Sequence, residues 1–292
     1  MLAIDFTSIA ITVAFMSALG VILSGILALA SHKLWVYEDP RIDEVEDLLP
    51  KTNCGACGTA GCRPFAEALI SGELTPANCT VGSEEEIAEI AEYLGVDAGD
   101  VVKRVARLAC AGGVHVARQR ARYEGLESCR AAAMVAGGPK SCTWGCLGLA
   151  DCEDVCELDA ISMDKHGLPV VDTSKCTACE DCVDICPKDL FSIQPVTHRL
   201  WVACKNLLRD EEAEAQCEVA CTGCEKCAKD APAGLIHIEN NLSRIDYSRN
   251  NLASPLAIER CPTGAIVWLD ESEGIRKGSK AKRIIREEAL PF

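Results

Sequence analysis

The cysteine pattern constrains this chain more than any other feature. Twenty of its 292 residues are cysteine, and many stand in C-x-x-C groups, whereas only 4% are aromatic. Because so few aromatic side chains leave a thin hydrophobic core for this length, something other than side-chain packing must hold the compact parts together. Cysteines can do so in two ways, as a secreted disulfide scaffold or as the ligands of an intracellular metal protein.

Composition narrows the class of protein further. The length suggests two or three small domains, and an apolar fraction of 49% excludes collagen-like and disordered chains. The formal net charge of -15 argues against nucleic acid as the main partner.

Residues 9–30 carry no charged side chain and could cross a bilayer core of ~30 Å as one helix. A cleaved signal peptide is the alternative, because an A-x-A pattern ends the stretch. The preceding segment, however, lacks Lys and Arg and contains Asp5, which favours a retained anchor. Lys33 and Arg41 follow the stretch, so the positive-inside rule predicts a single-pass protein of the inner or cytoplasmic membrane whose body faces the cytoplasm. A reducing cytoplasm favours metal thiolates over disulfides.

Gly20, Ser24 and Ala28 recur at every fourth position of this helix. Such a small-residue face lets a second transmembrane helix approach closely. A lone anchor that faces lipid fits the same pattern, so both interpretations stay open.

Four cysteines in the next segment can surround one iron–sulfur cluster, and they are Cys54, Cys57, Cys62 and Cys79. Glycines between them let the backbone turn sharply and direct N–H groups toward the sulfurs. A zinc site is the alternative, although zinc ligands more often form two separated pairs. Ser83 and Glu86 then form a capping box that predicts a helix, and a second helical stretch is predicted over residues 100–109.

The most specific motif runs from Cys176 to Pro187 and has the C-x2-C-x2-C-x3-C-P spacing of two-cluster bacterial ferredoxins. The fourth cysteine of such a run ligates the other cluster, so a partner run is expected. It begins at Cys142, with Leu149 where the middle cysteine would stand. One predicted cluster is therefore held by Cys142, Cys146, Cys152 and Cys186, and the other by Cys156, Cys176, Cys179 and Cys182.

An internal repeat extends this pattern. Short apolar segments at residues 160–163 and 190–193 follow the two runs, and they return at residues 234–238 and 265–268. They are predicted as β-strands of two ferredoxin-like modules. In the second module the four positions of one cluster hold no cysteine, and they are Ala231, Asn251, Ser254 and Ala257. The other cluster keeps all its ligands, which are Cys221, Cys224, Cys227 and Cys261.

Sixteen cysteines are thereby assigned to about four [4Fe–4S] clusters, and Cys110, Cys129, Cys204 and Cys217 remain. Buried free thiols, which pack as small hydrophobic groups, are the simplest role for them. Cys217 has a second interpretation. It precedes Cys221 by the interval that separates Cys142 from Cys146, so it could replace Cys224 as a ligand.

These patterns predict an α+β chain with a single N-terminal transmembrane helix, a small α-rich 4Fe–4S domain and two tandem ferredoxin-like modules, the second one degenerate. The predicted boundaries are 1–32 for the transmembrane anchor, 33–110 for the 4Fe–4S cluster domain with its linker, 111–200 for the two-cluster ferredoxin-like module, 201–270 for the degenerate single-cluster module and 271–292 for a basic tail. The tail is expected to be a solvated, flexible end. No Walker A loop, no GxGxxG after a strand and no catalytic grouping is present, so neither a nucleotide site nor a catalytic residue is predicted.

The order of these parts resembles the B subunit of the Rnf complex. The matching features are the N-terminal span, the Cys54 to Cys79 block, the sequences Cys110-Ala-Gly-Gly and Gly137-Gly-Pro-Lys-Ser-Cys142, and the Cys176 run. The resemblance implies a subunit of an ion-translocating ferredoxin:NAD+ oxidoreductase, a translocase that couples electron transport to the movement of Na+ or H+. It implies that reduced ferredoxin is the electron donor, that other Rnf subunits are partners in the membrane, and that NAD binds to sister subunits.

Two alternatives remain on the residues alone. One is a membrane-anchored redox sensor or iron–sulfur assembly scaffold, and the other is the electron-transfer subunit of a different membrane oxidoreductase. For the ferredoxin-dependent function, a local basic patch such as the tail is the hypothesised docking surface, because an acidic donor would be repelled by the acidic body.

Overall fold

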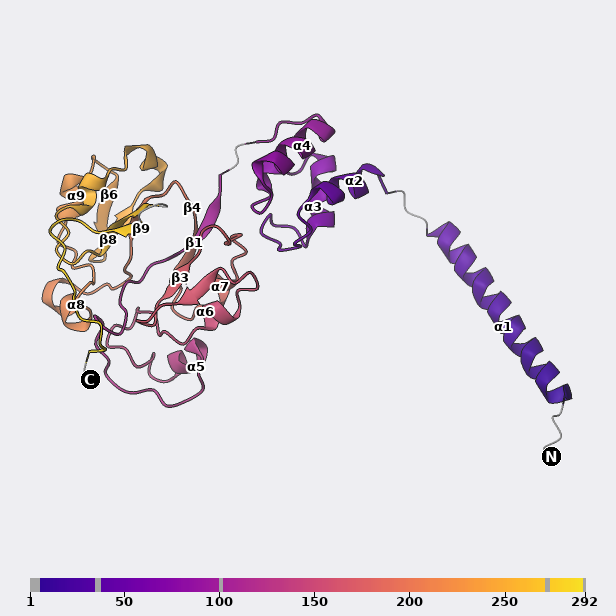
Figure 1. Ribbon diagram of the computed structural model, residues 1–292, viewed down its shortest axis with the longest axis horizontal. Coiled ribbons are helices and arrows are strands. Elements are labelled where there is room, and N and C mark those ends of the chain that lie inside the picture. Colours follow the sequence, from indigo (N-terminus) through magenta and orange to yellow (C-terminus); the bar gives the residue numbers. More distant parts are fainter. Residues whose placement is uncertain (1–5, 35–37, 100–101, 271–273, 291–292) are drawn as a thin grey trace.

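The computed structural model describes residues 6–34, 38–99, 102–270 and 274–290. Its first element is α1 (Phe6–Lys33), which stands apart from the rest of the chain in Figure 1. The window Ala10–Lys33 has a mean hydropathy of 2.3 and none of it is buried against other parts of the protein. The predicted single apolar N-terminal helix is therefore confirmed, and it is long enough to cross a membrane.

A small helical domain follows, built from α2 (Arg41–Leu48), α3 (Cys62–Ser71), the 3₁₀ helix η1 (Pro76–Asn78) and α4 (Glu84–Leu94). Its core is formed by apolar side chains of three of these helices, among them Val45, Phe65 and Ile90. Helix α4 begins at the predicted capping box, in which the Ser83 hydroxyl accepts from the Glu86 N–H at 3.2 Å. We call residues 41–99 the N-terminal cysteine domain.

The helix predicted over residues 100–109 is wrong within the described part of that range, which begins at Val102. Residues Arg104–Leu108 form strand β1, which pairs antiparallel with β4 (Phe191–Pro195). Local pattern alone suggested a helix, but β1 gains backbone hydrogen bonds from a strand more than 80 residues away and buries Val105 completely.

Residues 142–195, which we call unit 1, contain a short helix within each cysteine run, α6 (Asp151–Asp154) and α7 (Asp181–Ile185). Between these helices lies an antiparallel hairpin of β2 (Ile161–Met163) and β3 (Pro169–Val171). The first strand of the body, β1, pairs with the last strand of the unit, β4. Helix α5 (Cys129–Met134) lies in the segment that leads into unit 1.

Residues 217–270, which we call unit 2, repeat this order of pairing. Strand β5 (Leu200–Val202) pairs with the last strand β8 (Ile266–Asp270), and a hairpin of β6 (Ile236–Glu239) and β7 (Leu242–Ile245) lies between them. The remaining elements of this region are α8 (Asp210–Gln216), α9 (Lys226–Asp230), η2 (Tyr247–Leu252), η3 (Pro255–Ile258) and β9 (Gly274–Arg276), which extends the β5–β8 sheet. Figure 1 shows units 1 and 2 beside each other in one body.

The C-terminal tail differs from the predicted flexible end. It runs back over the body, and the Leu290 N–H donates to the Val114 carbonyl at 2.9 Å. The Arg286 side chain donates to the His115 carbonyl at 2.8 Å, and Lys282 and Arg286 both face the Glu218 carboxylate. Backbone hydrogen bonds and these ion pairs together fix a segment whose composition alone suggests a solvated end.

Candidate metal centres

The four cysteines of the N-terminal cysteine domain lie on a glycine-rich loop and its flanking helices. Asn53 fixes the loop, because its side-chain oxygen accepts from the Cys62 N–H at 2.8 Å, at the start of α3. Gly61 has a φ of 137°, and a Cβ there would lie 2.8 Å from the same oxygen, so only glycine fits. The Cys79 sulfur accepts from the Gly82 N–H at 3.3 Å. The loop therefore presents sulfurs together with backbone donors, as an iron–sulfur site requires.

Cys156, Cys176, Cys179 and Cys182 line one cavity in unit 1. The Ala160 N–H donates to Cys156 Sγ at 3.3 Å, and the Ala106 N–H on β1 donates to Cys176 Sγ at 3.4 Å. Cys54 of the N-terminal cysteine domain lines the same cavity. The two cysteine sites are thus neighbours, and the hydroxyl of Thr80 donates to the Thr177 carbonyl at 2.7 Å between them.

Cys129 occupies the place that the sequence left empty at Leu149. Its sulfur faces the Leu149 N–H, and the thiols of Cys152 and Cys186 lie close enough to affect each other's ionisation. The carboxylate of Asp151 holds α5 in position by accepting from the Cys129 N–H at 2.8 Å. Cys129 thus lies near Cys146, Cys152 and Cys186, which makes it a candidate for the fourth ligand of that set.

Cys142, predicted as the fourth member of that set, lines a hollow together with Cys110, Cys204 and Cys217. Sequence reasoning missed Cys129 because its partners are at least seventeen residues away, which no local motif reports. The equal intervals from Cys142 to Cys146 and from Cys217 to Cys221 were the available signal that these two cysteines share a role.

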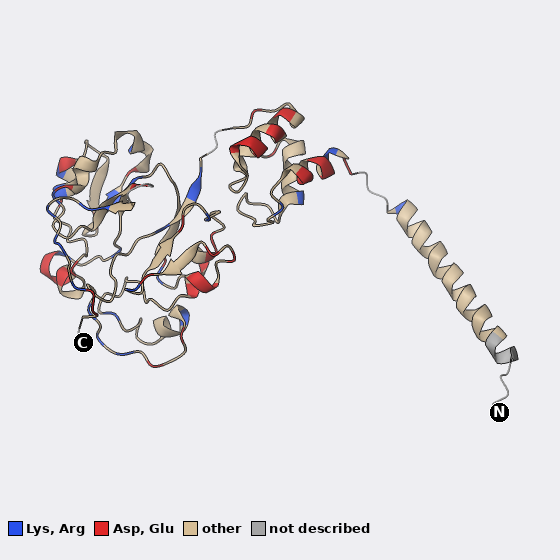
Figure 2. Cartoon of the chain, in the orientation of Figure 1, with Lys and Arg blue, Asp and Glu red and all other residues tan. Residues whose placement is uncertain are grey.

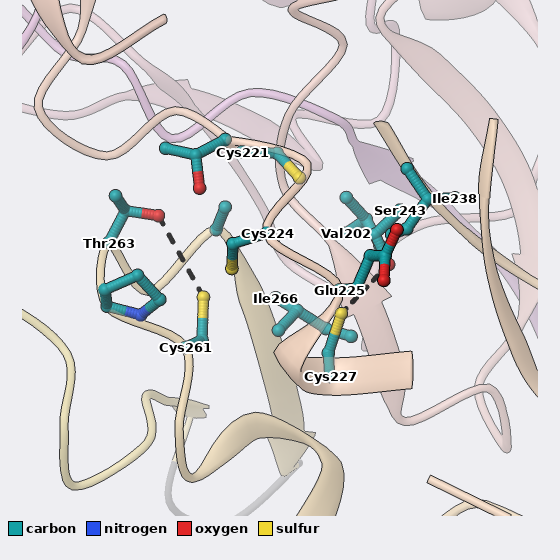
Figure 3. Close-up of a pocket in the computed structure, with 13 residues that line it drawn as sticks. Val202, Cys221, Cys224, Glu225, Cys227, Ile238, Ser243, Cys261, Thr263 and Ile266 are labelled. Carbon is teal, nitrogen blue, oxygen red and sulfur yellow. Dashed lines mark hydrogen bonds between the residues drawn. The ribbon is translucent and has the colours of Figure 1, made fainter. Parts of the chain in front are cut away.

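Cys221, Cys224, Cys227 and Cys261 surround a cavity in unit 2 (Figure 3). Cys227 and Cys261 are buried, and their sulfurs lie 3.4 Å from the Ser243 hydroxyl and 3.9 Å from the Thr263 hydroxyl. Cys224 belongs to this cavity and Cys217 does not. The geometry therefore favours Cys224 over the alternative in which Cys217 takes its place.

The chemistry of these sites fits iron–sulfur clusters. Burial raises the pKa of Cys146, Cys152 and Cys182 to about 12, so thiolates there need a strong positive partner. Among the described residues, no three Cys, His, Asp or Glu side chains come close enough to hold a single metal ion. A tetrahedral zinc site would need such close packing, whereas a cubane of four irons keeps its four thiolates further apart.

Comparison with known proteins agrees with this assignment. A family described as "Putative Fe-S cluster" matches residues 49–81, and a "4Fe-4S binding domain" family matches residues 169–191. The chain is 36% identical to the B subunit of the Na(+)-translocating ferredoxin:NAD(+) oxidoreductase complex of Acetobacterium woodii, over 89% of this chain and 78% of that protein. It is 37% identical to the B subunit of the ion-translocating oxidoreductase complex of Methanosarcina acetivorans, over 87% of this chain and 96% of that protein.

The chain belongs to the family of Rnf complex B subunits. The B subunit of the proton-translocating ferredoxin:NAD(+) oxidoreductase complex of Clostridium ljungdahlii supports this at 36% identity over 91% of this chain and 94% of that protein. As a member of this family with these two domain matches, the protein is a 4Fe–4S iron–sulfur protein. Its N-terminal helix fits the membrane association of such complexes.

Proposed function

We propose that this protein carries electrons from reduced ferredoxin through several [4Fe–4S] clusters to other subunits of an ion-translocating ferredoxin:NAD+ oxidoreductase. The observation that carries the proposal is the continuity of the cysteine sites. Cys54 lines the cavity of the Cys156 set, and Cys152 and Cys182 of the two sets in unit 1 pack in one core cluster. Neighbouring sites suit one-electron transfer, which is the chemistry that bound clusters would supply.

Units 1 and 2 are, in this proposal, tandem ferredoxin-like modules. Their matched strand pairing supports it, because in each a strand preceding the unit pairs with its last strand around a central hairpin. In this proposal the N-terminal cysteine domain precedes the modules and the tail follows them. The proposed ligands are the predicted ones, with Cys129 in the place of Cys142. They are Cys54, Cys57, Cys62 and Cys79; Cys156, Cys176, Cys179 and Cys182; Cys129, Cys146, Cys152 and Cys186; and Cys221, Cys224, Cys227 and Cys261.

The protein itself would tune these sites through backbone donors and burial. N–H groups of Gly82, Ala106 and Ala160 donate to the sulfurs of three proposed ligands. Such N–H···S contacts stabilise the more negative, reduced state of a cluster, whereas acidic residues nearby oppose it. Asp and Glu residues gather on α4 of the N-terminal cysteine domain and on α6, α7 and α8 of the body (Figure 2).

Docking of an acidic ferredoxin needs a local positive surface on this acidic chain. Lys277, Lys280 and Arg283 of the tail are exposed, and none of them forms a salt bridge within the described residues. We therefore assign the docking surface to these three side chains. Lys282 and Arg286 face Glu218 instead, so their charge is partly neutralised.

Charge reversal tests this surface without removing a tail that packs on the body. The variant K277E/K280E/R283E should slow the reduction of the clusters by ferredoxin at least tenfold at low salt, and the effect should shrink as salt is added. The control variant is Arg122→Glu, which reverses the charge of an exposed side chain in a different region. Equal rates for the two variants would exclude the tail as the docking surface.

Retention of clusters distinguishes the relay from the assembly scaffold. The full chain should keep its iron and sulfide during anaerobic purification, and reduced ferredoxin should reduce several clusters, as followed by EPR. A scaffold would instead lose its clusters to acceptor apoproteins. Zinc without sulfide in the purified protein would contradict both.

The body is assigned to the cytoplasmic side, because Lys33 in the last turn of α1 and Arg41 after it are basic. Proteolysis of membrane vesicles tests this. The body should be digested in inside-out vesicles and protected in right-side-out vesicles.

A further inference from the structure

The hollow that holds Cys142 lies between the two units and draws two cysteines from each side. Cys110 stands two residues after β1, and Cys204 stands two residues after β5, the equivalent strand. Cys142 precedes Cys146 by four residues, and Cys217 precedes Cys221 by four residues. The four cysteines are thus two equivalent pairs, one contributed by each unit and its leading strand.

Hydrogen bonds at the hollow follow the same equivalence. The Cys146 N–H donates to Cys110 Sγ at 3.4 Å, and the Cys221 N–H donates to Cys204 Sγ at 3.3 Å. The sulfurs of Cys142 and Cys217 each face a backbone N–H two residues further along the chain. Between the two halves, the Ala111 N–H donates to the Ala203 carbonyl at 3.0 Å. Each of the four sulfurs therefore has a backbone donor, which is the environment of the proposed cluster ligands elsewhere in the chain.

Lys140 provides an independent sign that an anion belongs in this hollow. Its side chain lines the hollow and is only 3% exposed, and its ammonium donates to the Gly112 carbonyl. No carboxylate among the described residues lies within 4.0 Å of it. A buried ammonium without an anionic partner destabilises the fold. The negative charge that balances it must therefore come from the cysteine thiolates that line the hollow.

The lining also gathers sulfurs and their donors around one space. A Cβ on Gly112 would lie 3.1 Å from Cys217 Sγ and 3.7 Å from Cys110 Sγ, so both sulfurs face one point of the backbone. Asn206 is 1% exposed and its side-chain amide donates toward Cys142 Sγ at 3.6 Å. Four cysteines line the hollow, as four line the cavity of Cys221, Cys224, Cys227 and Cys261.

We propose that Cys110, Cys142, Cys204 and Cys217 ligate a fifth [4Fe–4S] cluster, held between unit 1 and unit 2, with Lys140 as its buried counter-charge. All twenty cysteines of the chain then serve as ligands, in five sets of four. A cluster with four thiolates carries net negative charge, which Lys140 compensates. The ligands come from both units, so the site also joins them.

The position of this site places it between the cysteine set of unit 2 and the cysteine sets of unit 1. Cys110 accepts from Cys146 of one proposed site, and Cys204 accepts from Cys221 of another. A group bound between them therefore adjoins both neighbouring sets. This role rests on the proposed electron relay, whereas the existence of the site does not.

Iron content of the full chain, purified anaerobically in detergent, tests the site directly. The wild type should contain about 20 irons per chain, and C110A/C204A should contain about 16. C224A, which removes a ligand of the separate site in unit 2, calibrates the loss of one cluster. Combining all three changes should remove about eight irons, and the two variants should abolish different EPR signals. A C110A/C204A protein with the full iron content of the wild type would overturn the proposal, as would a combined loss of only about four.

Lys140→Met decides the question if C110A/C204A loses iron from every site. Methionine preserves volume but removes the counter-charge, so the potential of one cluster should fall in an EPR-monitored redox titration while the others stay unchanged. Lys165→Met, which alters an exposed lysine, is the matched control. Potentials that are identical in Lys140→Met, Lys165→Met and wild type would overturn the proposal. Ferredoxin plays no part in either experiment, so a failed fifth site and a failed electron relay are distinguishable.

Discussion

Units 1 and 2 have the same order of strands but different centres. In unit 1 the cavity next to β2 is lined by Cys156, Cys176, Cys179 and Cys182. In unit 2 the equivalent positions hold no cysteine, and an apolar core fills the region, with Leu200, Leu235 and Ile258 fully buried. The comparison shows that a ligand set and a hydrophobic core can occupy the same place in one framework.

Two alanine-to-leucine differences accompany the exchange. Ala160 follows Cys156 by four residues, and Leu235 follows Ala231 by four. Ala106 pairs with the residue two positions after Phe191 on β4, and Leu200 pairs with the residue two positions after Ile266 on β8. The small alanines leave space beside the sulfurs in unit 1, whereas the leucines fill that space in unit 2.

The first prediction transfers the core of unit 2 into unit 1. Ala160→Leu should reduce the iron content of the full chain by about four atoms, because Ala160 lines the Cys156 cavity and the added carbons occupy its space. Iron and sulfide analysis measures the loss. Val170→Leu, at a residue of β3 that is 53% exposed, should keep full iron. A fully loaded Ala160→Leu protein would show that leucine and a cluster are not alternatives at this place.

The second prediction concerns Cys129, the proposed ligand that lies outside the cysteine runs of unit 1. Cys129→Ala should remove between one and four irons, because the Leu149 position offers no sulfur to replace it. EPR of the oxidised protein would reveal a three-iron product, and iron analysis a complete loss. Met134→Ala on the same helix, at an 88% exposed residue, is the control. Unchanged iron and EPR would return Cys129 to the class of free thiols.

The third prediction removes the substitute core from unit 2. Leu235→Ala should lower the local free energy of unfolding by about 2–5 kcal/mol, because Leu235 is fully buried and the cavity left behind cannot close completely. Hydrogen exchange of β6 and β7 measures it. Leu256→Ala, at a 68% exposed side chain, should change it by less than about 0.5 kcal/mol. Equal protection in both variants would mean that Leu235 does not stabilise this unit.

The smallest expected effect lies on the surface of unit 2. Arg260 forms a two-point ion pair with Asp230, and its hydrogen bonds to that carboxyl lower the pKa of Asp230. The Arg260 side chain is 54% exposed, so solvent screens the pair, and Arg260→Ala should reduce the protection of α9 far less than Leu235→Ala reduces that of β6 and β7. Hydrogen exchange of α9 checks this, with Arg244→Ala as the control. A loss of protection as large as that of Leu235→Ala would assign the ion pair a main share in stabilising unit 2.

Local sequence predicted the parts of the molecule whose contacts lie close along the chain. The capping box at Ser83 starts α4, and the apolar segments after Cys156 and Cys186 overlap β2 and β4. The helix expected over residues 100–109 failed because β1 depends on β4, a partner that no local pattern contains. The same reason explains the tail, which is held by Glu218 and Val114 in distant segments.

The sequence by itself determined that this chain is an iron–sulfur protein with an N-terminal helix long and apolar enough to span a membrane. Cysteines in C-x-x-C groups can reach one common metal site, because a single tight turn of backbone brings both thiols to the same side. Only the tertiary structure decided which thiols lie near Cys110, Cys129, Cys142 and Cys217. Their neighbours are distant along the chain, so the spacing in the sequence does not say where each thiol points. Their positions follow from strand pairing and from the packing of one unit on the other, which bring sulfurs together across separations that spacing cannot encode.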